Sequence, residues 1–167
     1  KVLGLLLVSG SLVAVNWFTY IWAVNAGHVV ETSLGYYINP LLNVLLGFVF
    51  LGDRLNRMQT LAISLAVIGV MIMVVDFGRA PWIALVLAAT FGFYGLVRKV
   101  VNANPLPGLF IETLMVSLPA LSILIFWQTT GQAAFTNMGA KNDILLICTG
   151  IITSTPLILF AFGARRL

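Results

Sequence analysis

The sequence predicts an all-α protein, a polytopic membrane helix bundle with six transmembrane helices. Hydrophobic residues make up 60% of the 167 positions, charged residues make up only 8%, and the mean hydropathy is +1.06. A soluble domain carries about 25% charged residues. The few charges also fall in short joints between long apolar runs, so we expect each run to cross a lipid bilayer.

Each of the six apolar runs can cross about 30 Å of hydrocarbon as a helix, although the third and fourth are short. The expected spans are Val2–Val24, Thr32–Leu51, Thr60–Val75, Pro81–Val97, Leu106–Trp127 and Ile144–Gly163. Strands of a β-barrel would alternate apolar and polar residues, and residues 61–70 show no such alternation. Pro119 is expected to break the fifth span, because proline removes a backbone donor.

The basic residues predict the orientation of the helices. If the spans alternate in direction, seven basic residues fall on one side: Lys1, Arg54, Arg57, Arg98, Lys99, Arg165 and Arg166. Only Arg79 and Lys141 fall on the other. Basic loops stay in the cytoplasm, so the ends at Lys1 and Leu167 are expected to be cytoplasmic. These loops also explain the net charge of +4, and no span carries a basic stripe, so nucleic acid is not an expected partner.

A weak internal repeat indicates two related halves. With an offset of 140, residues 9–13 align with residues 149–153, and residues 18–23 align with residues 158–163. The two spans are five helices apart, so they would insert in opposite directions, as in the inverted repeats of secondary transporters. If the unit has five helices, residues 1–78 hold the last three helices of one unit and residues 79–167 the first three of the next.

Polar side chains concentrate in the first two spans. Helical spacing places Asn16 and Tyr20 one turn apart, and it places Tyr36, Asn39 and Asn43 on one face of the second span. Two facing stripes of amides and aromatic rings would line a cavity for a small amphipathic solute. The predicted solute-binding residues are Asn16, Trp17, Tyr20, Tyr36, Asn39, Asn43 and Tyr94. The alternative is that these side chains hydrogen-bond between helices without contacting a solute.

Four further residues are candidates for a hinge, a gate or a proton carrier. Pro40 interrupts the backbone hydrogen bonds in the middle of the second span, which predicts a hinge or a plain kink. His28 and Glu31, three residues apart, suggest a gating or pH-sensing contact, with a solvated loop histidine as the alternative. Glu112, inside the fifth span, is a candidate proton carrier.

The alternative for Glu112 is structural. Its side chain would then reach the cytoplasmic interface, or it would pair with Arg98 or Lys99.

Several motifs together resemble the RarD-type permeases of the EamA family, in the drug/metabolite transporter superfamily. They are Ser33-Leu34-Gly35-Tyr36-Tyr37-Ile38-Asn39-Pro40, Gly52-Asp53-Arg54, Phe91-Gly92-Phe93-Tyr94-Gly95-Leu96-Val97-Arg98-Lys99 and Ile111-Glu112-Thr113. The resemblance implies ten transmembrane helices in two inverted five-helix repeats, of which this chain supplies helices three to eight. It also implies a bacterial inner-membrane protein that moves small organic solutes, metabolites or drugs. Asp53 departs from the family, which usually has Glu there, but keeps the carboxylate.

The expected function is secondary transport by alternating access, with a small organic solute, the lipid bilayer and the remaining helices of the same polypeptide as partners. No Gly-x-x-x-x-Gly-Lys-Ser/Thr sequence is present to bind ATP. An intramembrane enzyme is not favoured, because the chain offers one histidine and no Gly-x-Ser-x-Gly, so no catalytic residue, cofactor or metal site is expected. The remaining alternative is a non-transporting integral membrane partner or regulatory subunit.

The repeat leads to a prediction about the native gene. We expect two more apolar spans before Lys1, and soon after Leu167 a second copy of the small-x-Gly-aromatic … Pro pattern of residues 33–40. Sequencing the gene on both sides checks this. A stop codon directly after Leu167 would count heavily against a carrier.

Overall fold

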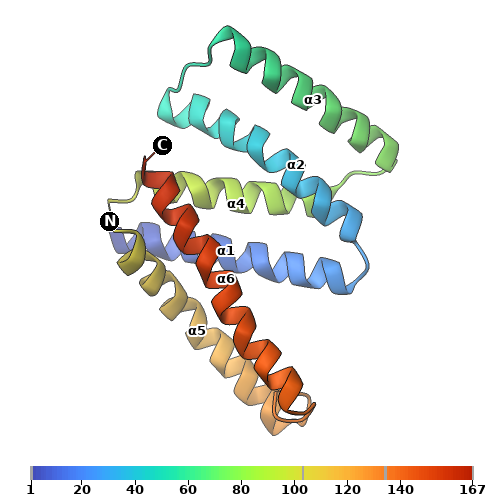
Figure 1. Cartoon of the computed structure of the whole chain (residues 1–167), viewed down its shortest axis with the longest axis vertical. Coiled ribbons are helices and arrows are strands. Elements are labelled where there is room, and N and C mark those ends of the chain that lie inside the picture. Colours follow the sequence, from blue (N-terminus) through green and yellow to red (C-terminus); the bar gives the residue numbers. More distant parts are fainter. Residues whose placement is uncertain (1, 103, 134, 167) are drawn as a thin grey trace. The chain divides into compact units, whose positions relative to one another are not determined.

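The computed structural model describes residues 2–102, 104–133 and 135–166 of the chain, and it confirms the predicted class of fold. The described residues form six α-helices and one short π-helical segment, with no strand among them (Figure 1). All six helices are long and apolar enough to cross a membrane. The elements are α1 (Val2–Asn25), α2 (Val29–Leu46), η1 (Gly47–Leu51), α3 (Arg57–Phe77), α4 (Trp82–Val100), α5 (Pro105–Thr129) and α6 (Ala140–Arg166). The chain ends predicted to be cytoplasmic, Lys1 and Leu167, lie outside the described residues.

Local signals at the two ends of α3, which hydropathy does not report, explain why this helix differs from the expected span. α3 begins three residues earlier than expected because Asn56 forms a capping box: its side chain accepts from the Gln59 amide at 2.8 Å, and the Gln59 side chain accepts from the Asn56 amide at 2.9 Å. The same helix ends at Gly78, whose φ of 72° is accessible to glycine at little cost.

Proline interrupts neither α2 nor α5. α2 continues through Pro40, and the expected break of the fifth span at Pro119 is wrong, since α5 is one continuous helix. Proline removes one backbone hydrogen bond while the neighbouring turns keep theirs, and membrane helices tolerate this. The irregular backbone lies instead after Leu46, where the π-helical η1 ends the second span.

The chain folds as two compact units. One contains Ser11–Val100, and the other contains Lys1–Gly10 with Val101–Leu167. The division follows spatial contacts and does not bear on the proposed repeat boundary at residues 78 and 79, which stays a prediction. Within the second of these units α5 packs against α6.

In the Ser11–Val100 unit, α4 packs closely against α2 at two glycines (Figure 1). A Cβ on Gly35 of α2 would lie 3.2 Å from both the Ala84 carbonyl oxygen and the Leu87 Cβ of α4. A Cβ on Gly92 of α4 would lie 3.1 Å from the Leu42 side chain of α2. Small residues at such contacts let two helix backbones approach, which increases van der Waals contact where lipid gives no hydrophobic driving force.

The close approach predicts that Gly35→Leu will destabilise the protein by about 1–3 kcal/mol, because the new side chain meets the α4 backbone. Gly69→Leu is the matched control, since nothing lies within 4 Å of a Cβ on Gly69. Unfolding of the purified complete protein in a denaturing-detergent titration measures both changes. Equal stability of the two variants would contradict the packing described here.

Candidate functional site

Asn16 connects α1 to α4. Its side-chain amide donates to the Leu87 carbonyl oxygen at 2.9 Å and to the Thr90 hydroxyl oxygen at 2.9 Å. The Thr90 hydroxyl in turn donates to the Val86 carbonyl oxygen at 2.7 Å. Asn16 therefore makes the interhelical hydrogen bonds that the sequence offered as the alternative to solute binding, and its Nδ2 group has both protons engaged.

Tyr20 connects α1 to α2. Its ring meets the Tyr36 ring edge to face, with centroids 6.0 Å apart and planes at 70°. This is a favourable aromatic geometry, because the positive edge of one ring meets the negative face of the other. Both tyrosines remain exposed in this chain. The structure thus brings together the two predicted polar stripes at this pair.

Asn39 and Asn43 follow Tyr36 along α2, on the side towards α4. The Asn39 Oδ1 atom is buried and accepts no hydrogen bond from any described residue. The Asn43 side chain is exposed, and its Oδ1 atom would lie 3.3 Å from a Cβ on Gly92. A buried amide oxygen without a donor is costly in a membrane, so the Asn39 position suits a ligand that supplies one.

The other two predicted solute-binding residues lie differently. Trp17 is exposed on α1, whereas Tyr94 is fully buried on α4, with its ring centroid 5.8 Å from that of Phe91. Among the predicted residues, the structure therefore shows Tyr20 of α1 against Tyr36 of α2, and it places Asn16 and Asn43 against α4.

Glu112, the candidate proton carrier, is buried about two turns into α5. It accepts a hydrogen bond from the Ser9 hydroxyl of α1. Gly10 makes this approach feasible, since a Cβ there would lie 3.5 Å from the Glu112 Cα. This burial does not fit a side chain that reaches the cytoplasmic interface, whereas pairing with Arg98 or Lys99 stays an open alternative. Whether it carries protons stays a prediction.

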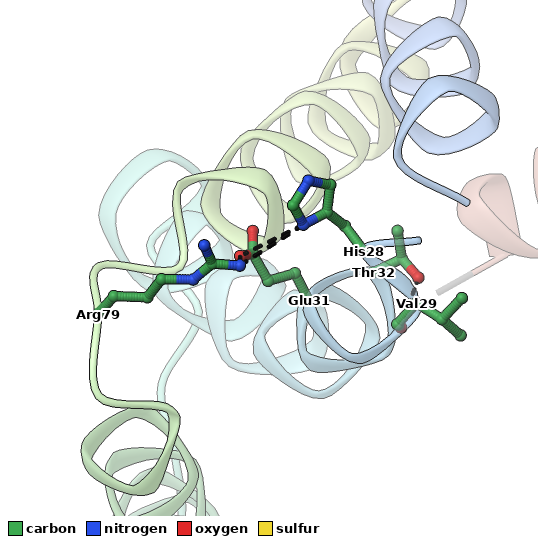
Figure 2. Close-up of polar contacts among 5 residues, drawn as sticks. All are labelled: His28, Val29, Glu31, Thr32 and Arg79. Carbon is green, nitrogen blue, oxygen red and sulfur yellow. Dashed lines mark hydrogen bonds and ion pairs between the residues drawn. The ribbon is translucent and has the colours of Figure 1, made fainter. Parts of the chain in front are cut away.

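A second group of charged and aromatic side chains lies at the start of α2 (Figure 2). The Arg79 guanidinium, from the joint between α3 and α4, binds the Glu31 carboxylate at 2.7 Å. The His28 Nδ1 lies 3.5 Å from the same guanidinium and 4.0 Å from the Glu31 Oε1. The sequence indicated the His28–Glu31 pair but not Arg79, because 48 residues separate the ion-pair partners.

Metal binding has no support in the described part of the chain, where no group of three or more His, Cys, Asp or Glu side chains could hold an ion. The one cysteine, Cys148, is partly buried in α6 and has a free thiol.

Comparison with known proteins agrees with this membrane architecture. Residues 1–75 match the model of the EamA-like transporter family. Over these residues the chain is similar to this family. Across 98% of its length the chain is 48% identical to an "Uncharacterized transporter" of Vibrio cholerae serotype O1 and 45% identical to "Protein RarD" of Escherichia coli strain K12.

A more distant relative is "Chloramphenicol-sensitive protein RarD" of Pseudomonas aeruginosa, which is 31% identical over 94% of the chain. The chain spans about half the length of these curated relatives, 54%, 55% and 50% respectively. No solved structure matches it significantly. The similarity is therefore to proteins that are named as transporters or as RarD, over about half of their length.

The Asn16–Thr90 bond predicts an energetic coupling between α1 and α4. In a double-mutant cycle of Asn16→Ala and Thr90→Val, the coupling should be about 0.6–1.7 kcal/mol, the range for hydrogen bonds between membrane helices. Unfolding free energies of the four proteins give the value. Ser64→Ala is the control, because this hydroxyl bonds only within α3, to the Thr60 carbonyl oxygen. Strictly additive effects would contradict the bond.

Proposed function

We propose that the complete protein is a secondary carrier that moves small organic solutes by alternating access, with its solute site on α1, α2 and α4. The observation that carries the proposal is the convergence of uncharged polar side chains from these helices. Tyr20 meets Tyr36 across α1 and α2, while the Asn39 amide oxygen is buried without a donor. Aromatic faces would bury the apolar parts of a solute, and the amides would fix its orientation.

Exposure on α2 supports the same proposal. Tyr36 is 63% exposed, and the exposed Asn43 follows two turns later. Polar groups facing hydrocarbon are costly, so this surface is expected to face a cavity or further helices of the complete polypeptide. Trp17 and Tyr94 would extend the lining, Pro40 would act as the hinge, and Glu112, His28 and Glu31 would serve coupling or gating.

The organisation and location proposed for the complete protein follow from the charge distribution and the repeat. Residues 1–78 and 79–167 would belong to two inverted five-helix units that rock about a site at the middle of the bilayer. Seven of the nine basic residues would face the cytoplasm of a bacterial inner membrane. Arg79, and with it the start of α2, would face the outer side.

Transport by the complete protein in proteoliposomes tests the proposal. Tyr36→Ala and Asn43→Ala should each raise the solute concentration for half-maximal transport about two- to tenfold, because each removes a contact of about 0.5–1.5 kcal/mol. Tyr37→Ala is the matched control, since Tyr37 is 61% exposed but lies on another face of α2. Wild-type transport by both test variants, with folded protein present, would remove these residues from the site.

A further inference from the structure

The Glu31 carboxylate is a buried charge whose partner is exposed. Glu31 is 2% exposed, whereas the side chain of Arg79 is 61% exposed and joins it at 2.7 Å (Figure 2). A buried carboxylate needs a cation, because desolvation of an unpaired charge is strongly unfavourable. A side chain of the protein or a bound solute could supply this cation.

Arg79 binds only one of the two carboxylate oxygens of Glu31. The Glu31 Oε2 atom is buried and has no hydrogen-bond partner among the described residues. The ion pair joins Arg79 Nη2 to Oε1, whereas a guanidinium seated squarely on a carboxylate would reach both oxygens with two parallel bonds. Oε2 is therefore an acceptor that a better-placed cation could satisfy.

Aromatic rings lie beside this ion pair. His28 stacks on Trp22 of α1 with centroids 5.9 Å apart, and Trp22 contacts Trp82 of α4 at 5.8 Å. Both tryptophan rings remain exposed. The faces of such rings attract organic cations, most strongly the face of tryptophan. A buried carboxylate that is connected through His28 to exposed indole rings is a donor set suited to an organic cation.

Arg79 has a second interaction besides its ion pair with Glu31, a contact with the Phe77 ring. It follows Gly78, whose φ is 72°, in the short joint between α3 and α4. Its guanidinium carbon already lies 5.0 Å from the centroid of the Phe77 ring. The guanidinium can therefore leave Glu31 and keep a cation–π contact, which lowers the free-energy cost of giving up the ion pair.

We propose that Glu31 is the counter-ion of a subsite for the cationic head of an organic solute, a guanidinium or an alkylammonium, and that Arg79 occupies this subsite when no solute is bound. Trp22 and Trp82 form its aromatic wall. This inference rests on the proposed carrier function and names a class of solute for it. The incoming cation replaces the Arg79 guanidinium on Glu31, so no net charge is buried by the exchange.

The opposite reading is a structural ion pair in which Arg79 only stabilises Glu31. The two readings predict different outcomes for one measurement, the affinity for a cation after removal of Arg79. If Arg79 competes with the solute, its removal increases affinity for a cation. If Arg79 only holds Glu31 in place, its removal leaves the affinity unchanged or lowers it.

The experiment measures equilibrium binding of radiolabelled benzylguanidinium to the complete protein in detergent. Arg79→Gln should tighten binding about tenfold, because the apparent affinity is reduced by the fraction of sites that Arg79 occupies. Glu31→Gln should weaken binding at least about thirtyfold, in both the wild-type and the Arg79→Gln backgrounds. Unlabelled benzylurea, which has a similar shape and no charge, should not compete.

Arg54→Gln is the matched control, because Arg54 is an exposed arginine of the same unit that follows the opposite end of the second span. Its affinity should equal that of the wild type. If Arg79→Gln does not fold, Arg79→Lys replaces it: lysine keeps the charge beside Glu31 but lacks the planar fork, so binding should tighten by a smaller factor.

Four results would overturn the subsite. They are unchanged or weaker binding after removal of Arg79, unchanged binding in Glu31→Gln, equal binding of benzylurea, and displacement of the probe by sodium ions at constant ionic strength. Transport assays on the same preparations separate this inference from the carrier itself. Transport of a solute without this binding pattern contradicts only the subsite, whereas Glu31-dependent binding without any transport contradicts only the carrier.

Discussion

Hydrocarbon offers no hydrogen-bond partners to a polypeptide backbone, and the rest of this structure depends on that constraint. Each span must satisfy its own amides and carbonyls, so it forms a long helix whose irregularities are confined to particular places. The π-helical turn after Leu46 lies at the end of the second span, beside Gly52, and the residues that follow return to polar loop. Even the two prolines at 40 and 119 lie within continuous helices.

Once the helices exist, side-chain size decides which of them meet. Gly35 and Gly92 permit α2 and α4 to approach until a Cβ at either position would be crowded. This approach sets the positions of the polar side chains that the same helices carry. The Asn43 amide lies against Gly92, and Asn16 reaches across from α1 to the Thr90 hydroxyl of α4. The close packing of these helices therefore also determines where their polar side chains lie.

Charged side chains in this structure need different partners from uncharged polar side chains. An amide or hydroxyl can be satisfied by hydrogen bonds between helices, as at Asn16, whereas an ionised buried carboxylate needs a counter-charge. Glu31 has such a counter-charge in Arg79, which is itself exposed and lies in the joint before α4. An ion pair with one buried and one exposed member is asymmetric, and the exposed member can move away at the lower cost. That asymmetry is what makes the start of α2 a place where a cation could be exchanged.

The sequence by itself determined the membrane class, the number of helices in the described chain and their approximate limits, because hydropathy over about twenty residues reports directly on transfer into lipid. The residues of local motifs, such as the capping box at Asn56, are also present in the sequence, although hydropathy alone placed the start of α3 three residues late. Helical spacing grouped Asn39 and Asn43 with Tyr36 on one face of the helix, since period and face are local properties. Only the tertiary structure decided that Asn16 bonds Thr90, that Tyr20 meets Tyr36, and that Arg79 neutralises Glu31. These partners are 74, 16 and 48 residues apart, and which helix faces which is set by close packing at a few glycines rather than by any local pattern.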